Sequence, residues 1–210
     1  MSTQTTNLDY ALKWNPRPSY IPRYILLCVV LSLVSIVLSY WGVTNLTPKF
    51  KGVGALYPAS VFYALFTYWF GGWGLIASFI GAFIGAGVLP GVQWETALLV
   101  AVADIWEPLV PFLLIRFFGP RLGISPLGDN ILGSVSNTVI FIVFGAILPP
   151  LVSGIWGAWF LVRARGEFWV AVRTWWIGAS ILLAIFVPPV CRLMAGILRK
   201  KDLACHGIWS

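Results

Sequence analysis

The sequence predicts an all-α protein, a polytopic integral membrane helix bundle of about six transmembrane helices. Of the 210 residues, 59% are hydrophobic and only 10% are charged, whereas a soluble domain averages roughly 25% charged residues. So little charge cannot cover a water-exposed globule of this size, so a lipid bilayer is expected to surround it. The apolar runs far exceed the roughly 10 residues of a membrane-spanning strand and show no alternation, so they are expected to be helices.

Charged and turn-forming residues divide the chain into three parts. Residues 1–23 form a polar cytoplasmic N-terminal segment, residues 24–193 form the transmembrane bundle, and residues 194–210 form a short basic cytoplasmic tail. The first apolar run is longer than a signal-peptide core of about 7–15 residues, so it is predicted to be a retained anchor. The spans are expected near residues 24–46, 53–70, 73–91, 95–117, 130–162 and 168–192.

Two of these runs contain proline pairs. The run at 130–162 holds Pro149-Pro150 and is long, so it contains either one kinked span or a span plus a short interfacial piece. The last span is expected to break at Pro188-Pro189, because proline removes a backbone donor from a helix.

The basic residues predict the orientation, with both termini in the cytoplasm at the cell (inner) membrane. Nine lie on the predicted inner side, namely Lys13, Arg17, Arg23, Arg116, Arg121, Arg192, Arg199, Lys200 and Lys201. Five lie on the outer side, namely Lys49, Lys51, Arg163, Arg165 and Arg173. The net charge of +7 does not indicate a nucleic-acid partner, because these residues flank apolar runs as juxtamembrane residues do.

The fourth span carries two carboxyl groups near its middle, Asp104 and Glu107. Each ionised carboxylate there costs roughly 2.5–3.5 kcal/mol on insertion scales, so a lipid-facing position is unfavourable. Positions i and i+3 share one helix face, and both side chains are therefore expected to point into the bundle. Pro108 and Pro111 cannot donate to the carbonyls four residues earlier, which are those of Asp104 and Glu107.

This oxygen-rich turn has several interpretations. It could bind a proton, the amine of a ligand or a cation, with a dedicated metal site the weakest of these. Alternatively, the carboxyl groups are neutral because they have lost hydration, or they bond to Asn137 or Arg173 and join helices. These alternatives stay open at the level of the sequence.

Glycines and aromatic residues define two further features. Gly81 with Gly85, and Gly87 with Gly91, form small-xxx-small faces that allow close helix packing. Ser35 and Ser39 give the first span a weaker face of the same kind. Trp175 and Trp176 form either an interfacial belt or the aromatic wall of a ligand pocket, with Arg173 and Tyr57 at its outer mouth.

The sequence shows no P-loop, no histidine cluster and no nucleophile elbow, so no enzyme activity, no cofactor and no metal are expected. The single histidine, His206, is expected to be solvated in the tail. Cys28, Cys191 and Cys205 have no metal-ligand spacing and are interpreted as ordinary buried thiols.

The order of motifs resembles that of the MASE-type membrane-associated sensor domains of bacterial signalling proteins, over about residues 53–193. The matching pieces are Tyr57-Pro58-Ala59, the Gly-rich third span, Ala103-Asp104 with Glu107, and Trp175-Trp176-Ile177-Gly178 followed by Pro188. The chain departs from the family at Asp104, where an Asn is usual, and at Ala179, where an Asp is frequent. The family usually carries an output domain, whereas this sequence stops within 20 residues of the last predicted span.

A second resemblance is to the substrate-capture (S) subunits of energy-coupling-factor vitamin transporters. These subunits are six-helical and similar in size, and they often carry a phrase like Phe70-Gly71-Gly72-Trp73-Gly74. This resemblance accounts better for the length of the chain and less well for the later tryptophan motif.

Three function hypotheses follow. The first is a MASE-like recognition module that binds a small solute or a partner membrane or signalling protein within the bilayer. The second is the substrate-binding subunit of a transporter for a vitamin-like solute or a cation, and the third is an accessory subunit of a larger membrane complex. The expected ligand-binding residues are Asp104, Glu107, Asn137, Arg173, Trp175, Trp176 and Tyr57.

Overall fold

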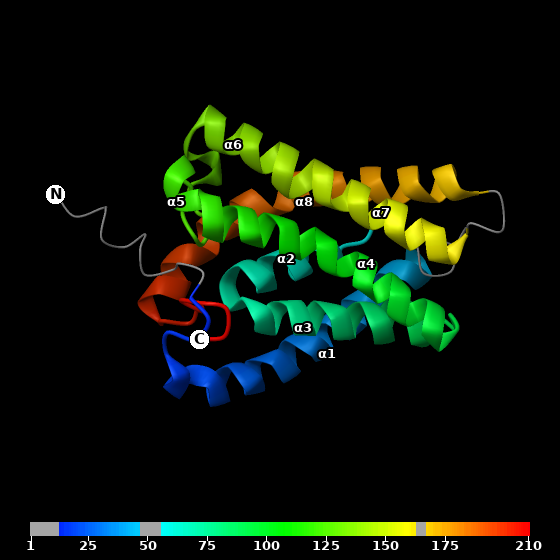
Figure 1. The fold of residues 1–210 in the computed structure, drawn as a ribbon, viewed down its shortest axis with the longest axis horizontal. Helices are drawn as coiled ribbons and strands as arrows, with labels where there is room; N and C mark the ends of the chain where they lie inside the picture. The colour runs from blue at the N-terminus through cyan, green and yellow to red at the C-terminus, as the bar shows by residue number, and fades with distance from the viewer. Residues whose placement is uncertain (1–12, 47–55, 163–166) are drawn as a thin grey trace.

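The computed structural model describes residues 13–46, 56–162 and 167–210. Every regular element in these ranges is helical, as the sequence predicts, and the helices lie side by side in a bundle (Figure 1). In chain order the elements are η2 (Pro18–Tyr20), α1 (Ile21–Asn45), α2 (Ala59–Phe70), α3 (Gly72–Ile80), η3 (Gly81–Val88), α4 (Trp94–Leu113), η4 (Leu114–Phe118), α5 (Gly119–Leu122), η5 (Ile131–Gly133), α6 (Val135–Phe141), η6 (Ile142–Ile147), α7 (Leu148–Leu161) and α8 (Phe168–Lys200). Lys49, Lys51, Arg163 and Arg165, assigned above to the outer side, lie outside the described residues.

Four continuous helical runs are long and apolar enough to cross a membrane: Pro18–Asn45, Trp94–Phe118, Val135–Leu161 and Phe168–Lys200. Two further apolar helices, Ala59–Phe70 and Gly72–Val88, are shorter. The 12 residues of α2 extend about 18 Å at 1.5 Å per residue, less than the roughly 30 Å hydrocarbon core. The helices therefore support a multi-pass membrane protein, and four of them have the length of a full span.

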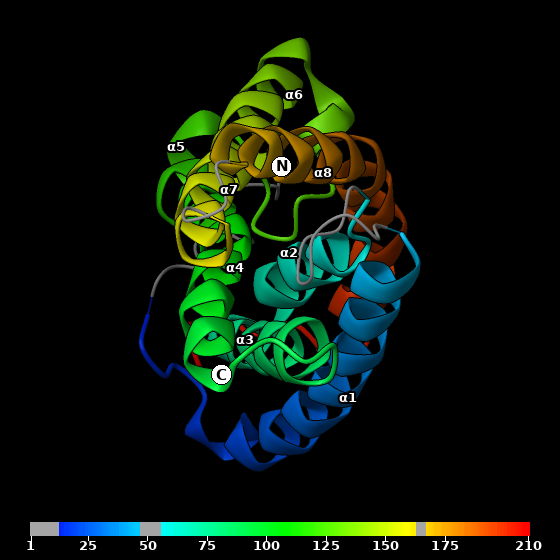
Figure 2. The ribbon, with the colours of Figure 1, turned by 90° about the vertical axis from the view of Figure 1, so that its right-hand side faces the viewer.

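Helix α2 lies at the centre of the bundle, between α1, α3, α4 and α8 (Figure 2). All of its residues except Phe62 are buried. A helix that is apolar on every side is expected in such a position, because it has no face to give to water. Gly71, with φ of 56°, turns the chain from α2 into α3, a backbone conformation that a residue with a Cβ rarely adopts.

The glycine-rich third helix contacts α1 closely. A Cβ added at Gly81 would meet the side chain of Ser35, and one added at Gly85 would meet the backbone carbonyl of Ile36. Gly87 lies instead against Ala97 at the start of α4. Gly91 is in the turn after the helix, with φ of 84°, so its role is in the turn and not in a helix face.

The proline pairs do not interrupt the helices that contain them. Val135–Leu161 is one continuous run in which Pro149 and Pro150 lie at the start of α7, so residues 130–162 hold one long helix. Helix α8 continues through Pro188 and Pro189 to Lys200, so the predicted break is wrong. Helices that pack against neighbours in a membrane tolerate proline, because the freed carbonyls are satisfied by other groups.

The residues after α8 form an ordered structure that we call the terminal clasp, residues 202–210 packed on residues 13–17. The Ile208 amide donates to the Lys13 carbonyl (2.8 Å), and the Gly72 amide donates to the Ile208 carbonyl (2.8 Å). The Cys205 amide donates to the Trp69 carbonyl (2.7 Å). The clasp therefore joins the segment before α1 to the turn between α2 and α3.

Polar side chains also hold the terminal clasp. Asp202 forms an ion pair with Arg17 (2.6 Å) and a hydrogen bond with His206 (2.9 Å). His206 is only 7% exposed, so the expectation of a solvated tail histidine is wrong. Arg116, buried in η4, donates to the Cys205 carbonyl (2.8 Å) and to the Tyr68 carbonyl (3.0 Å). These long-range contacts could not be predicted from the polar appearance of the tail.

We expect Gly85→Ala to lower the stability of the folded protein by about 1–3 kcal/mol, because the added methyl group has no space against the Ile36 carbonyl. The matched control is Gly196→Ala in α8, where nothing lies within 4 Å of the added Cβ. Denaturant unfolding in detergent, followed by circular dichroism, measures both variants. Equal stability of the two variants would contradict the close contact of η3 with α1.

The terminal clasp is expected to loosen at acid pH. Burial alone would raise the pKa of Asp202, but the His206 hydrogen bond and the Arg17 charge outweigh it and hold the pKa below its usual value. Such a carboxyl stabilises the folded form at neutral pH. That contribution is lost as the pH falls below about 4, the ordinary aspartate range, and through the lowered pKa of the folded state.

Asp202→Asn should loosen the clasp already at neutral pH, because it removes the charge while asparagine tolerates the φ of 47° at this position. Hydrogen exchange of residues 203–210, read by mass spectrometry, is expected to accelerate in this variant. Asp129→Asn, which removes the Arg199 ion pair at the same end of the bundle, should leave that exchange unchanged. Protection that persists in Asp202→Asn would show that the ion pair does not hold the clasp.

Candidate functional site

Helix α4 places two carboxyl groups inside the bundle. Asp104 is 2% exposed and Glu107 is 0% exposed. Both lie near the middle of the run Trp94–Phe118, and their i, i+3 spacing puts them on the face that packs against other helices. The inward direction is the expected one, since the cost of lipid-exposed carboxylates is avoided in this way.

Glu107 is held from α8 and α7. The indole N–H of Trp175 in α8 donates to Glu107 Oε1 at 2.7 Å. The ring of Trp175 packs against α7 where Gly154 and Gly157 leave room for it, since a Cβ at Gly157 would meet the indole carbons. The Ser153 hydroxyl of α7 lies beside Glu107 without closing a hydrogen bond of ordinary geometry. Three helices therefore converge on this carboxyl group.

A chain of hydroxyl groups joins the start of α2 to α1 within electrostatic range of Asp104. The Tyr57 and Tyr63 hydroxyls are 2.9 Å apart, and Tyr63 bonds in turn to Ser39. Ser39 donates its hydrogen to the Ser35 carbonyl, so Tyr63 donates to Ser39 and Tyr57 donates to Tyr63. The Asp104 carboxyl interacts electrostatically with both tyrosines. The Tyr57 oxygen at the end of the chain keeps its capacity to accept a hydrogen bond.

One oxygen of each carboxyl group is buried without a hydrogen-bond partner, Oδ1 of Asp104 and Oε2 of Glu107. Within residues 13–46, 56–162 and 167–210, no basic side chain forms an ion pair with either group. The buried Ser153 hydroxyl is also unpaired. An unsatisfied buried polar group costs about 1–3 kcal/mol, more when charged, so the turn favours a hydrogen-bond donor or a positive charge.

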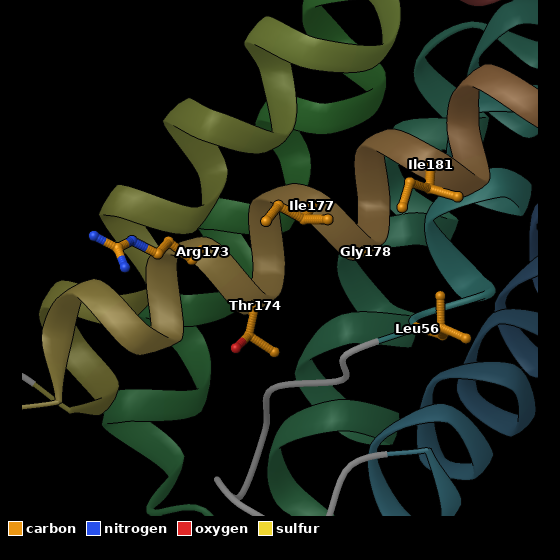
Figure 3. A pocket seen from close by; sticks show the side chains of 6 residues that line it. All are labelled: Leu56, Arg173, Thr174, Ile177, Gly178 and Ile181. Atoms are coloured by element: carbon orange, nitrogen blue, oxygen red, sulfur yellow. The ribbon is translucent and has the colours of Figure 1, made fainter.

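The other predicted ligand-binding residues lie elsewhere. The Asn137 side chain donates to the Asn130 carbonyl (3.2 Å), so it is tied to the loop before α6 and does not bond to the carboxyl groups. Trp176 donates to the Ile147 carbonyl (3.0 Å) and links α8 to η6. Arg173 is exposed and lines a surface hollow with Thr174 and Ile177 (Figure 3). Neither Asn137 nor Arg173, the predicted partners of the acids, bonds to them; Trp175, predicted in a belt or a pocket wall, bonds to Glu107 instead.

Sequence reasoning missed the polar residues that complete the site, Tyr63, Ser39 and Ser153. Each is fully buried in the structure. In the sequence, Ser39 stands out only as part of a packing face, and Ser153 lies within a long apolar run. One feature of the sequence could have identified these residues: they are among the few polar side chains in uncharged apolar runs. A buried polar side chain in a membrane helix needs a hydrogen-bond partner on another helix. Among the described residues, no group of three or more histidine, cysteine or acidic side chains could hold a metal ion.

We expect Trp175→Phe to lower the stability of the folded protein by about 1–3 kcal/mol, because it leaves Glu107 Oε1 without its hydrogen bond in a buried position. The control is Trp169→Phe in the same helix, where the side chain is 63% exposed. Thermal unfolding of both variants in the same detergent measures the difference. A Trp175→Phe variant as stable as Trp169→Phe would show that this bond does not hold α8 on α4.

Comparison with known proteins gives no relative: no protein-family model, no curated protein and no solved structure matches the chain. The resemblances to sensor domains and to transporter subunits therefore rest on short motifs alone. The function has to be inferred from the geometry of the acidic turn and from the membrane-length helices around it.

Proposed function

We propose that the chain is a membrane-embedded recognition module that binds a small, positively charged group within its helix bundle, at Asp104 and Glu107. One observation carries this proposal. Two fully buried carboxyl groups on one turn each keep an unpartnered oxygen, and no basic residue of the described chain neutralises them. A bound ammonium group, alkali cation or proton would supply the missing charge and hydrogen-bond donors.

The chemistry of the surrounding groups supports a cationic ligand over an anionic one. Pro108 and Pro111 leave the carbonyls of Asp104 and Glu107 without the usual helical donor. The Tyr57 hydroxyl, as the end of its hydrogen-bond chain, offers a further acceptor near Asp104. Acceptors thus outnumber donors around the turn. An anion would meet two carboxyl groups at close range and be repelled.

The proposal includes the topology that such a module needs. We assign six crossings, with the shorter helices Ala59–Phe70 and Gly72–Val88 forming a central pair, and both termini on the cytoplasmic side of the cell membrane. The orientation rests on the excess of basic residues at that end. No reaction is assigned to the site. A partner membrane or signalling protein would read the bound state, as in the MASE-type domains that the motifs resemble, or would drive release, as in a transport subunit.

The hydrogen bond between Trp175 and Glu107 favours a second candidate. A 2.7 Å hydrogen bond between α8 and α4 is typical of a contact that only joins two helices. In an accessory subunit of a larger complex, the carboxyl groups would have this structural role. The two candidates differ in the carboxyl oxygens that they use for hydrogen bonds. An interhelical tie needs only Glu107 Oε1, whereas a binding site needs Asp104 Oδ1 and Glu107 Oε2.

The test uses the purified full chain in mild detergent, titrated with sodium, ammonium or methylammonium chloride at constant ionic strength. At least one cation should raise the unfolding temperature, because a ligand that binds only the folded state stabilises it by about 2.7 kcal/mol at 100 times its Kd. Asp104→Asn combined with Glu107→Gln should abolish the rise without preventing membrane insertion. Glu95→Gln, which removes an exposed carboxyl group from the same helix, should keep it.

Native mass spectrometry of the same protein identifies any retained solute and any partner chain. A cation-induced rise that persists in the double variant would remove the acidic turn as the site. No rise with any cation, together with a co-purified protein complex and no small solute, would replace the recognition module by the accessory subunit.

A further inference from the structure

Two surface hollows adjoin along one side of α8, away from the acidic turn. The first has a volume of about 350 Å³ and is lined by Leu56, Arg173, Thr174, Ile177, Gly178 and Ile181 (Figure 3). The second has a volume of about 300 Å³ and is lined by Pro58, Val61, Phe62, Leu65, Leu182, Phe186 and Val190. Neither is lined by Asp104 or Glu107. A site on this surface is therefore independent of the function proposed above.

The two hollows follow one row of side chains, and we call them together the α8 groove. Thr174, Gly178, Leu182, Phe186 and Val190 succeed one another at intervals of four residues, so they form one ridge that is inclined to the axis of α8 and winds gradually around it. The opposite wall is formed by Leu56 and by the face of α2 that begins at Pro58. At 1.5 Å per residue, the groove extends about 24 Å along α8.

The two ends of the α8 groove differ in chemistry. The residues that line its inner part are all apolar. Its outer end carries Arg173 and Thr174, and Figure 3 shows the Thr174 side chain directed toward the hollow while the guanidinium of Arg173 extends beyond its rim. Within the described residues, no carboxylate forms an ion pair with Arg173. The groove is therefore amphipathic along its length, with a positive charge at one end only.

Exposed tryptophans indicate the depth of that positive end. Trp94, Trp159 and Trp169 are 62%, 50% and 63% exposed, and they lie at the start of α4, near the end of α7 and at the start of α8. These helix ends all face away from the terminal clasp (Figure 1). Tryptophan gathers at the membrane–water interface. Arg173, one turn further along α8, then lies at the depth of lipid headgroups.

We propose that the α8 groove binds one anionic glycerophospholipid of the leaflet opposite the terminal clasp. The phosphate pairs with Arg173 and one acyl chain lies between α2 and α8. The apolar part from Ile177 to Val190 extends about 20 Å, which exceeds the roughly 15 Å of hydrocarbon in one leaflet.

The test is native mass spectrometry of the full chain after incubation with phosphatidylglycerol or phosphatidylcholine carrying palmitoyl and oleoyl chains. The wild-type protein should retain phosphatidylglycerol about tenfold better. Arg173→Gln should remove this preference, because both lipids carry a phosphate but only phosphatidylcholine adds a positive choline group, which the Arg173 charge repels. Arg192→Gln, at another exposed arginine of α8, should keep it. Ile177→Trp should weaken retention of both lipids by filling the groove, whereas Leu193→Trp, at a position 75% exposed outside it, should not.

Four results would overturn the proposal. The first is equal retention of the two lipids by the wild-type protein, and the second is an equal loss in Arg173→Gln and Arg192→Gln, which would indicate bulk electrostatics. The third is an Ile177→Trp variant that behaves as Leu193→Trp does. The fourth is displacement of phosphatidylglycerol by inorganic phosphate, which would make the positive end a free-anion site and leave the apolar part without a role.

Discussion

Two carboxyl groups in the middle of an apolar helix have one favourable direction, which is toward other helices, and the arrangement of the bundle follows from this constraint. Asp104 and Glu107 are buried on α4, so α4 has to be covered on that face. Helices α2, α7 and α8 provide the cover, with the Trp175 bond to Glu107 and the Trp156 bond to the Leu99 carbonyl (3.0 Å) fixing its position. Gly81 and Gly85 of η3 then allow α1 to close the other side.

The structure shows how a short helix can stay in the core of a membrane protein. Helix α2 has only 12 residues, yet α1, α3, α4 and α8 surround it (Figure 2). Its flanking backbone is satisfied by other chain segments, as in the Cys205 bond to the Trp69 carbonyl, so lipid does not have to meet unpaired groups. The hydroxyl chain from Tyr57 to Ser39 uses the same protected interior.

Much of the fold and part of the site could be predicted from the sequence. The burial of Asp104 and Glu107 follows from the cost of charge in hydrocarbon, and the helical class follows from the length of the apolar runs. The partners of the two acids were harder to predict, because they depend on which helices are neighbours. The sequence favours Asn137 or Arg173 as the partner, yet the Asn137 amide is used within its own loop and Trp175 bonds to Glu107. The prediction of a helix break at Pro188 is wrong, because it applied the behaviour of proline in soluble helices. In a packed bundle, other groups satisfy the carbonyls that lose their backbone N–H donors.

The terminal clasp has a consequence for biosynthesis. A membrane protein is inserted from its N-terminus as the ribosome delivers it, and early helices wait in the translocation machinery or the lipid for later ones. Here the Lys13 and Trp14 carbonyls accept hydrogen bonds from the Ile208 and Trp209 amides, and the Gly72 amide, in the turn between α2 and α3, donates to the Ile208 carbonyl. Segments that precede α1 and α3 are thus completed by residues made after all of the described helices. Until residues 205–209 are in place, the Lys13 and Trp14 carbonyls and the Gly72 amide lack these partners, so this end of the bundle is completed only after α8 has formed.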